Sequence, residues 1–109
     1  MVPFFNGNNY ARETLTSSSS AQQPTQSIYR VVLDGQAVSP RYAVVTVETN
    51  PIRFTRTTPP TTPVDATPVG QLHGPTTPYQ LVLIGEGQIE NFRFVQNTGA
   101  GKVHFEYFR

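Results

Sequence analysis

A long run of threonine and proline in the middle of this 109-residue chain limits how it can fold. Residues 57–78 hold six prolines and seven threonines in 22 residues and show neither a helical nor a strand period. Strand-like segments lie on both sides, over residues 27–56 and 79–109. Each flank has about thirty residues, and chains below about 40 residues rarely hold a core alone. The flanks must therefore pack on each other, which predicts an internal loop at residues 57–78 rather than an interdomain linker.

This Thr/Pro loop is also a candidate contact element. A structureless loop longer than about 12–15 residues in a compact domain is usually functional, and proline and β-branched threonine stiffen an extended chain. We expect Val64, Val69 and Leu72 to anchor parts of the loop to the core, in part as a short edge strand. The remainder is predicted to be exposed and extended, with Pro59 and Pro60 contacting a partner.

The first flank contains segments in which apolar and polar residues alternate, as in half-buried strands. Residues 27–35, SIYRVVLDG, are rich in β-branched residues and end in an Asp-Gly dipeptide typical of tight hairpin turns. Residues 41–49, RYAVVTVET, are the clearest strand. An Asn-Pro dipeptide then interrupts the pattern before residues 52–56, IRFTR, because proline cannot donate to a strand ladder.

The second flank continues in the same manner. Residues 79–85, YQLVLIG, are almost continuously apolar, which predicts a central strand. Residues 89–96, IENFRFVQ, place Phe92 and Phe94 on one face, and residues 102–109, KVHFEYFR, close the chain after a glycine-rich turn. No segment of ten residues shows the period of an amphipathic helix.

These patterns predict an all-β fold: a single antiparallel β-sandwich, jelly-roll-like, over residues 27–109 with about six or seven strands. Alternation within each strand selects the side chains that face the core. The predicted core residues are Ile28, Val45, Val47, Phe54, Leu81, Leu83, Phe92, Phe94, Phe105 and Tyr107.

Residues 1–26 are predicted to form an extended N-terminal arm. The tract SSSS at residues 17–20 is of low complexity, and such a polar segment does not offset an ordering cost of about 1–2 kcal/mol per residue. Phe4, Phe5 and Tyr10 nevertheless lie in the arm, and exposed apolar groups usually mark a contact. We expect the arm to order against a partner with these aromatics as anchors; folding back onto its own domain is the alternative.

The charge content is low and its balance is unusual. Charged residues make up 14% of the chain and the net charge is +1, so electrostatics predicts neither a nucleic-acid nor a membrane partner. Seven of the eight basic residues are arginine, which suits fixed, planar contacts at interfaces. Arg12 and Arg56 therefore join the predicted partner contacts.

The absence of cysteine excludes disulfides and thiolate chemistry. The beginning of the sequence lacks the pattern of a signal peptide, and no apolar run approaches the roughly 18 residues of a membrane span. These features favour an intracellular origin or an assembled particle.

No pattern predicts catalysis, a cofactor or a metal, so we expect a protein that is not an enzyme. The segment NTGAGKV at residues 97–103 is not a phosphate loop: the residue before it, where glycine is needed, is Gln96, and Val103 stands where serine or threonine is needed. His73 and His104 have no H-x-x-x-H spacing or acidic cluster beside them, and no G-x-S-x-G elbow is present.

Aromatic residues alternate with arginine in the segments IRF and FRF, which is compatible with a single-strand nucleic-acid platform. The small net charge makes a core role for these aromatics the favoured interpretation. A glycan-binding β-sandwich is a further alternative, because exposed tyrosine and phenylalanine stack on sugars, although the chain has no tryptophan.

Several short motifs occur in a fixed order over residues 42–109. They are Pro-Ile-Arg-Phe at 51–54, Thr-Thr-Pro at 61–63, Gly70, Ile-Glu-Asn-Phe-Arg at 89–93 and Phe-Glu-Tyr-Phe at 105–108. In this order they resemble small virion proteins encoded in the structural gene clusters of tailed bacteriophages. The size and β-rich pattern are more loosely similar to the capsid decoration proteins, also called cement or staple proteins, of short-tailed phages.

The resemblance implies a structural viral protein on the capsid exterior, assembled in the host cytoplasm. It implies binding to the major capsid protein and self-association on the capsid surface. Residues 1–41 carry no matching motif, so the virion position stays open between the capsid and a tail or head–tail joining component.

Overall fold

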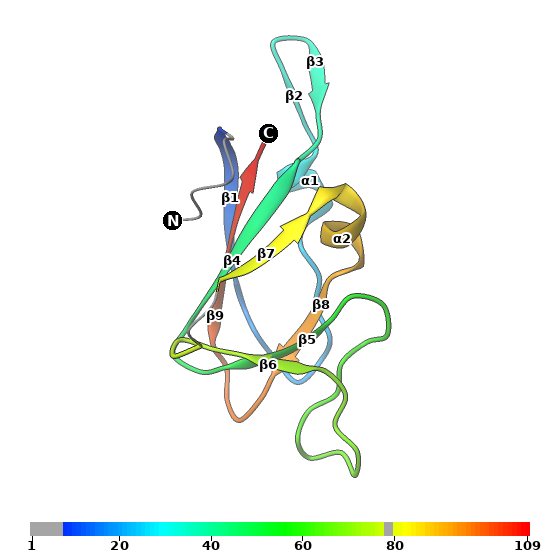
Figure 1. The fold of residues 1–109 in the computed structure, drawn as a ribbon, viewed down its shortest axis with the longest axis vertical. Helices are drawn as coiled ribbons and strands as arrows, with labels where there is room; N and C mark the ends of the chain where they lie inside the picture. The colour runs from blue at the N-terminus through cyan, green and yellow to red at the C-terminus, as the bar shows by residue number, and fades with distance from the viewer. Residues whose placement is uncertain (1–7, 78–79) are drawn as a thin grey trace.

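The computed structural model describes residues 8–77 and 80–109. Within these residues lie nine strands and two short helices, and all strand pairing is antiparallel (Figure 1). The elements are β1 (Asn9–Thr16), α1 (Gln26–Tyr29), β2 (Val31–Leu33), β3 (Gln36–Val38), β4 (Tyr42–Glu48), β5 (Ile52–Thr55), β6 (Gln71–His73), β7 (Leu81–Ile84), α2 (Gly85–Asn91), β8 (Arg93–Gln96) and β9 (Lys102–Phe108). The predicted all-β, antiparallel fold is confirmed.

The larger sheet has four strands in the order β1-β9-β4-β7. β4 is central: Val45 lies opposite Phe105 of β9, and Ala43 lies opposite Leu83 of β7. Along β9 every second side chain is buried, as the alternation in KVHFEYFR predicts. One face of this sheet therefore lies against the core.

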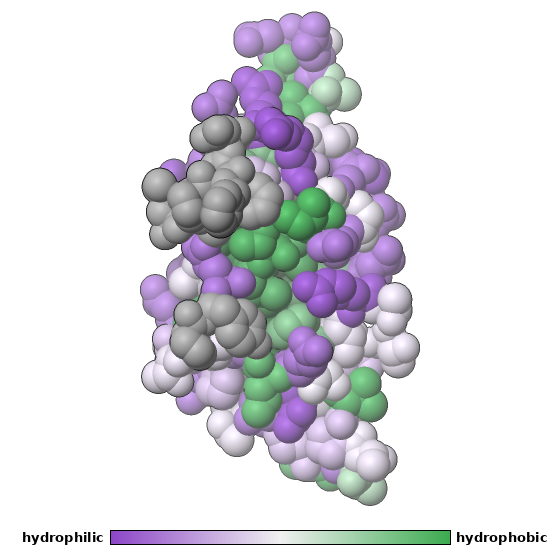
Figure 2. Space-filling model, in the orientation of Figure 1, coloured by the Kyte–Doolittle hydropathy of each residue, from purple (hydrophilic) through white to green (hydrophobic). Residues whose placement is uncertain are grey.

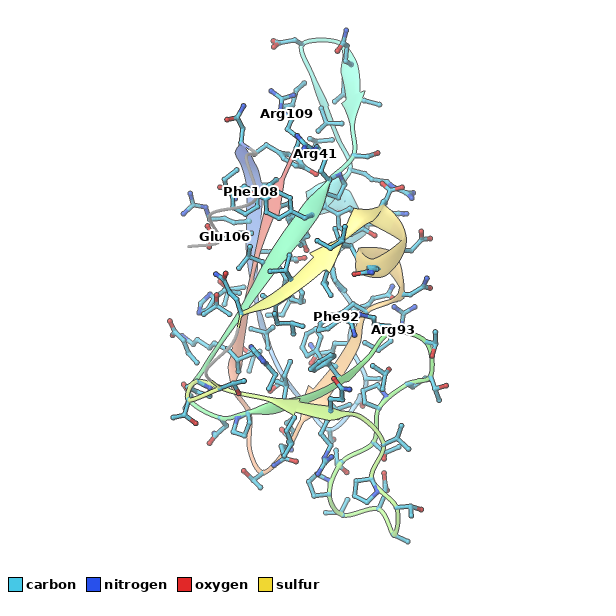
Figure 3. All side chains as sticks on the ribbon, in the orientation of Figure 1. Arg41, Phe92, Arg93, Glu106, Phe108 and Arg109 are labelled. Carbon is cyan, nitrogen blue, oxygen red and sulfur yellow. The ribbon has the colours of Figure 1, made fainter. Side chains whose placement is uncertain are left out.

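The smaller sheet has three strands in the order β6-β5-β8, and its apolar face packs against that of the larger sheet. Phe54 of β5 lies opposite Phe94 of β8. The ring centroid of Phe105 is 5.8 Å from that of Phe94 and 5.9 Å from that of Phe92. Phe92, labelled in Figure 3, directly precedes β8. These rings join the two sheets into a sandwich, while its jelly-roll connectivity stays a prediction.

The sequence pattern identified the core well. All predicted core residues except Ile28 are buried, and Ile28 is partly buried against the core. The reason is that Ile28 lies in α1, where the strand alternation does not apply. Its neighbour Tyr29 is buried instead, with its ring centroid 5.3 Å from that of Tyr107.

Short helices replace parts of two predicted strands. α1 takes the beginning of the segment SIYRVVLDG, and α2 takes the beginning of IENFRFVQ, so that only β2 and β8 remain as strands there. The helices have four and seven residues, which is too short for a 3.6-residue period to be visible in the sequence. Gln88 of α2 also stabilises the start of its helix, because its Oε1 accepts from the Ile84 backbone N–H at 2.8 Å.

The prediction that residues 79–85 form a central strand is wrong. β7 is the edge strand of the larger sheet. Leu81 and Leu83 face the core, while Val82 and Ile84 alternate onto the outer face, where Ile84 is 48% exposed. Figure 2 shows apolar side chains gathered over β4 and β7 on this face. The continuous apolar run therefore indicated an apolar outer face rather than a central position.

The expected extended arm covered residues 1–26, and within residues 8–26 the structure differs from it. Residues 9–16 form β1, which pairs with β9, and Ala11 and Leu15 pack against the core. The sequence NYARETLT conceals this strand because one of its inward positions is a glutamate, Glu13, which is half-buried among hydrogen-bond donors. After β1, the chain at Gln22 runs along the outer edge of β8. The Gln22 N–H donates to the Phe94 oxygen at 2.9 Å, and the Phe94 N–H donates to the Gln22 oxygen at 3.0 Å.

The strands before the Thr/Pro loop pair with the strands after it in both sheets. In the larger sheet β4 pairs with β7 and β9, and in the smaller sheet β5 pairs with β8. The loop contributes β6, a short edge strand of the smaller sheet. The expected anchors Val64, Val69 and Leu72 are exposed. Pro60 and Thr62 are buried in their place.

The sandwich is elongated, with extents of 48 × 26 × 19 Å. The hairpin β2–β3 projects at one end, and the loop between β5 and β6 projects at the other (Figure 1). The two projections therefore lie at opposite ends of the molecule.

Candidate interaction surfaces

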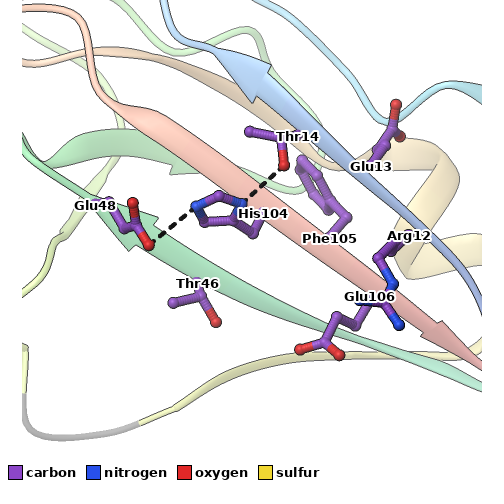
Figure 4. Close-up of a pocket in the computed structure, with 8 residues that line it drawn as sticks. All are labelled: Arg12, Glu13, Thr14, Thr46, Glu48, His104, Phe105 and Glu106. Carbon is purple, nitrogen blue, oxygen red and sulfur yellow. Dashed lines mark hydrogen bonds and ion pairs between the residues drawn. The ribbon is translucent and has the colours of Figure 1, made fainter.

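A shallow polar depression of about 310 Å³ lies on the outer face of the larger sheet, over β1, β9 and β4 (Figure 4). The register places Thr14, His104 and Thr46 in one row across these strands. Thr14 Oγ1 is 2.8 Å from His104 Nδ1, and His104 Nε2 is 3.3 Å from Glu48 Oε1. A hydroxyl, an imidazole and a carboxylate thus follow one another in contact.

This order resembles that of a catalytic triad, but its setting is that of a surface network. The Glu48 side chain is 61% exposed, so water competes with the imidazole for the carboxylate. Even a fully charged pair at an exposed position contributes only about 0–1 kcal/mol. A triad needs an orienting carboxylate that is held in place, which the exposed Glu48 does not provide. His104 lies on the outer face of β9, and the sequence did not indicate its contact with Thr14.

A second polar cluster lies on the inner side of β1. Glu13 Oε1 accepts hydrogen bonds from the Tyr107 hydroxyl at 2.7 Å and from the Thr25 backbone N–H at 2.8 Å. Burial raises the pKa of Tyr107 well above its ordinary value, and the adjacent Glu13 carboxylate raises it further. The phenol therefore stays protonated and donates, and the cluster fastens the segment before α1 to the sheet.

Tyr10 is not an exposed anchor. Its hydroxyl donates to the backbone oxygen of Tyr29, and its ring is partly buried against the core. Desolvation raises the pKa of Tyr10 to about 12, so the hydroxyl stays a donor at neutral pH. Phe4 and Phe5, the other predicted anchors, lie outside the described residues.

The remaining predicted contacts are dispersed over the molecule. Arg12 is exposed on the outer face of the larger sheet, beside the polar depression. Arg56 stands over the Phe54 ring, with its guanidinium carbon 5.7 Å from the ring centroid. Pro59 is exposed but Pro60 is buried. The structure therefore brings Arg56 and Pro59 to the end of the molecule that carries the loop, and it places Arg12 elsewhere.

The hairpin β2–β3 forms a two-stranded sheet of its own. Leu33 lies opposite Gln36, and both turn residues have positive φ, 51° at Asp34 and 77° at Gly35. This is the turn that an Asp-Gly dipeptide favours, so the predicted turn is confirmed. Val32 in this hairpin is 69% exposed.

The loop at the opposite end exposes a more prominent aliphatic side chain. Val64 is 90% exposed. Thr61 and Val69 lie close together at the base of the loop, where the Thr61 N–H donates to the Val69 oxygen at 3.0 Å. The prediction that this loop contacts a partner stays a prediction, and the expectation that Val64 anchors the loop to the core is wrong.

No family model, curated protein or solved structure matches the chain. In residues 8–77 and 80–109, neither helix is long and apolar enough to cross a membrane. The same residues contain no group of three or more His, Cys, Asp or Glu side chains that could hold a metal ion. Function is therefore inferred from the surfaces described above.

Proposed function

We propose that this protein is a virion structural protein without enzymatic activity, a decoration protein that binds the capsid exterior. In this role it contacts neighbouring copies of the major capsid protein, holds them together and associates with further copies of itself on the shell. We also propose that the strands of the sandwich are connected as in a jelly roll.

The observation that carries the proposal is the placement of two projecting elements at opposite ends of a molecule 48 Å long. Each presents an exposed aliphatic side chain, Val32 in the hairpin and Val64 in the loop. A rigid body with a contact element at each end can touch two subunits at once. The second contact then forms at high effective concentration, which raises avidity without a large interface.

A protein that binds only the assembled shell stabilises the shell by mass action. Many copies, each spanning one subunit boundary, would together resist expansion of the shell when it is heated. The packed aromatic core supports this role, because a rigid connector transmits force between its two ends. The low charge content suits a surface that is covered by partners rather than solvent.

Reconstitution on capsids that lack the protein tests the proposal. We expect the purified protein to bind with high copy number and to raise the temperature at which the genome is released. A few copies at a single vertex would instead assign it to the tail or the head–tail junction. Failure to bind particles, together with specific retention on a polysaccharide column, would favour a glycan-binding module.

A further inference from the structure

The loop between β5 and β6 has a closed neck. Thr61 and Val69 meet there through two hydrogen bonds: the Thr61 N–H donates to the Val69 oxygen at 3.0 Å, and the Val69 N–H donates to Thr61 Oγ1 at 2.6 Å. Residues 62–68, which we name the tip loop, are thereby separated from the rest of the Thr/Pro loop as a unit with its ends held together.

The neck is fastened to the sandwich. Arg53 of β5 donates from Nη1 to the Gly70 oxygen at 3.0 Å and from Nε to Asn97 Oδ1 at 3.0 Å. Gly70 has a φ of 120°, and a Cβ at this position would lie 3.1 Å from Cβ atoms of both Arg53 and Pro60. Pro60 and Thr62 are buried beside it. The neck is therefore a packed part of the domain.

Beyond the buried Thr62, residues 63–68 of the tip loop are exposed, and their backbone is conformationally restricted. The Asp65 N–H donates to the Thr62 oxygen at 3.0 Å, which closes a turn. Pro63 and Pro68 stand near its two ends, and proline restricts the backbone of each position. Val64 is 90% exposed at this turn, so the tip loop presents an aliphatic side chain from a held backbone.

A held loop loses little conformational entropy when it binds, which is the usual advantage of a preorganised contact. We propose that the tip loop is a preformed plug that inserts Val64 into an apolar pocket of a protein partner, with Asp65 facing a basic side chain at the pocket rim. Asp65 is the one formal charge in residues 62–68, so it sets the charge of the rim. The proposal rests on the proposed function, which makes the capsid shell the partner.

Binding of the full-length protein to capsids that lack it, measured by cosedimentation, tests the plug. We expect Val64→Ser to weaken binding about tenfold, because the burial of a valine would no longer contribute, and Val64→Asp to weaken it further. Thermal unfolding of both variants should match the wild type, because the side chain is 90% exposed in the free protein. Leu72→Ser is the matched control: Leu72 is an exposed aliphatic residue of β6 outside the tip loop, and its replacement should leave binding unchanged.

Charge reversal tests the rim. Asp65→Lys should weaken binding more than Asp65→Asn, and the difference should shrink at high salt. If the wild type binds shells and Val64→Asp binds within twofold of it, the plug is wrong while the proposed function stands. If the wild type itself does not bind shells, both are overturned.

Discussion

Two polar side chains occupy inward strand positions where the alternation of apolar and polar residues would place an apolar side chain. Glu13 occupies an inward position of β1 and satisfies two donors that would otherwise be buried without partners. His73 is buried at 4% exposure on β6, with its ring centroid 6.3 Å from that of Phe54. Both residues resemble surface or loop positions in the sequence, and both contribute to the interior.

Glu13→Ala should lower the free energy of unfolding by about 1–3 kcal/mol, because the Tyr107 hydroxyl and the Thr25 N–H would lose their acceptor. Glu13→Gln keeps an acceptor oxygen and should cost less. Urea denaturation of the three proteins measures the difference. The outward-facing variant Thr16→Ala on the same strand serves as control, and an equally small effect of Glu13→Ala would show that the cluster is not stabilising.

His73 should make stability depend on pH. Burial lowers the pKa of His73 below its ordinary value of 6.5, because desolvation disfavours the charged form. Below about pH 6.5 the unfolded chain gains a proton that the folded chain does not, so the free energy of unfolding falls until the pH reaches the folded-state pKa.

The change in urea midpoint between about pH 7.5 and about pH 5.5 measures this effect. We expect a smaller change in His73→Gln than in the wild type. A loss of stability that His73→Gln causes equally at both pH values does not affect this comparison, because the change in midpoint is taken within each protein. Identical pH dependence in the two proteins would contradict the assignment.

At the scale of elements, two connections between strands pack so closely that one of them needs glycine. Gly101 precedes β9, and its N–H donates to Ser17 Oγ at 2.8 Å. A Cβ at Gly101 would lie 2.3 Å from the Asn50 backbone oxygen, so the turn before β9 packs against the β4–β5 connection without space for a side chain. The glycine-rich turn seen in the sequence thus has a packing reason that only the structure reveals.

Gly101→Ala should therefore destabilise the domain by about 1–3 kcal/mol or more, because the backbone of one connection must move. Gly87→Ala is the matched control. Gly87 lies in α2 with open space around the added Cβ, and alanine favours helix over glycine by up to about 1 kcal/mol. Thermal unfolding should show opposite signs for the two variants; a loss in both would contradict the packing argument.

At the scale of the entire domain, the distance between the two projecting ends is the property that supports a connector. The hairpin and the tip loop are separated by the full length of the sandwich (Figure 1). Neither end has to bind tightly, because simultaneous binding multiplies their effects. A two-ended connector therefore predicts that weakening either end alone removes most of the stabilisation of the shell, although the other end still binds.

Val32→Asp tests this at the hairpin. Val32 is 69% exposed, so the folded monomer should keep its stability, while binding to capsids weakens and heat protection of the shell disappears. Combining Val32→Asp with Val64→Asp should abolish detectable binding. Full heat protection by the Val32 variant would show that only one end of the molecule contacts the shell.

Much of the fold could be predicted because strand alternation is a local property. The inward faces of β4, β5 and β9, the Asp-Gly turn and the internal position of the Thr/Pro loop all follow from residue spacing. α1 and α2 could not be recognised, because four and seven residues are too few for a helical period. β1 was missed because a glutamate at an inward position looks polar until its partners, distant in the sequence, are known.

Residue order alone was enough to establish the all-β class and most of the core, since both depend on the period of the side chains. It also indicated an internal Thr/Pro loop, because neither flank is long enough to fold without the other. Three outcomes required the folded structure: residues 9–16 belong to a sheet, β7 is an edge strand, and Pro60 is buried while Val64 is exposed. The first two outcomes depend on pairing between residues far apart in the chain, such as Glu13 with Tyr107 and Ala43 with Leu83. Local patterns report which faces of an element are apolar, but the topology decides what lies against each face.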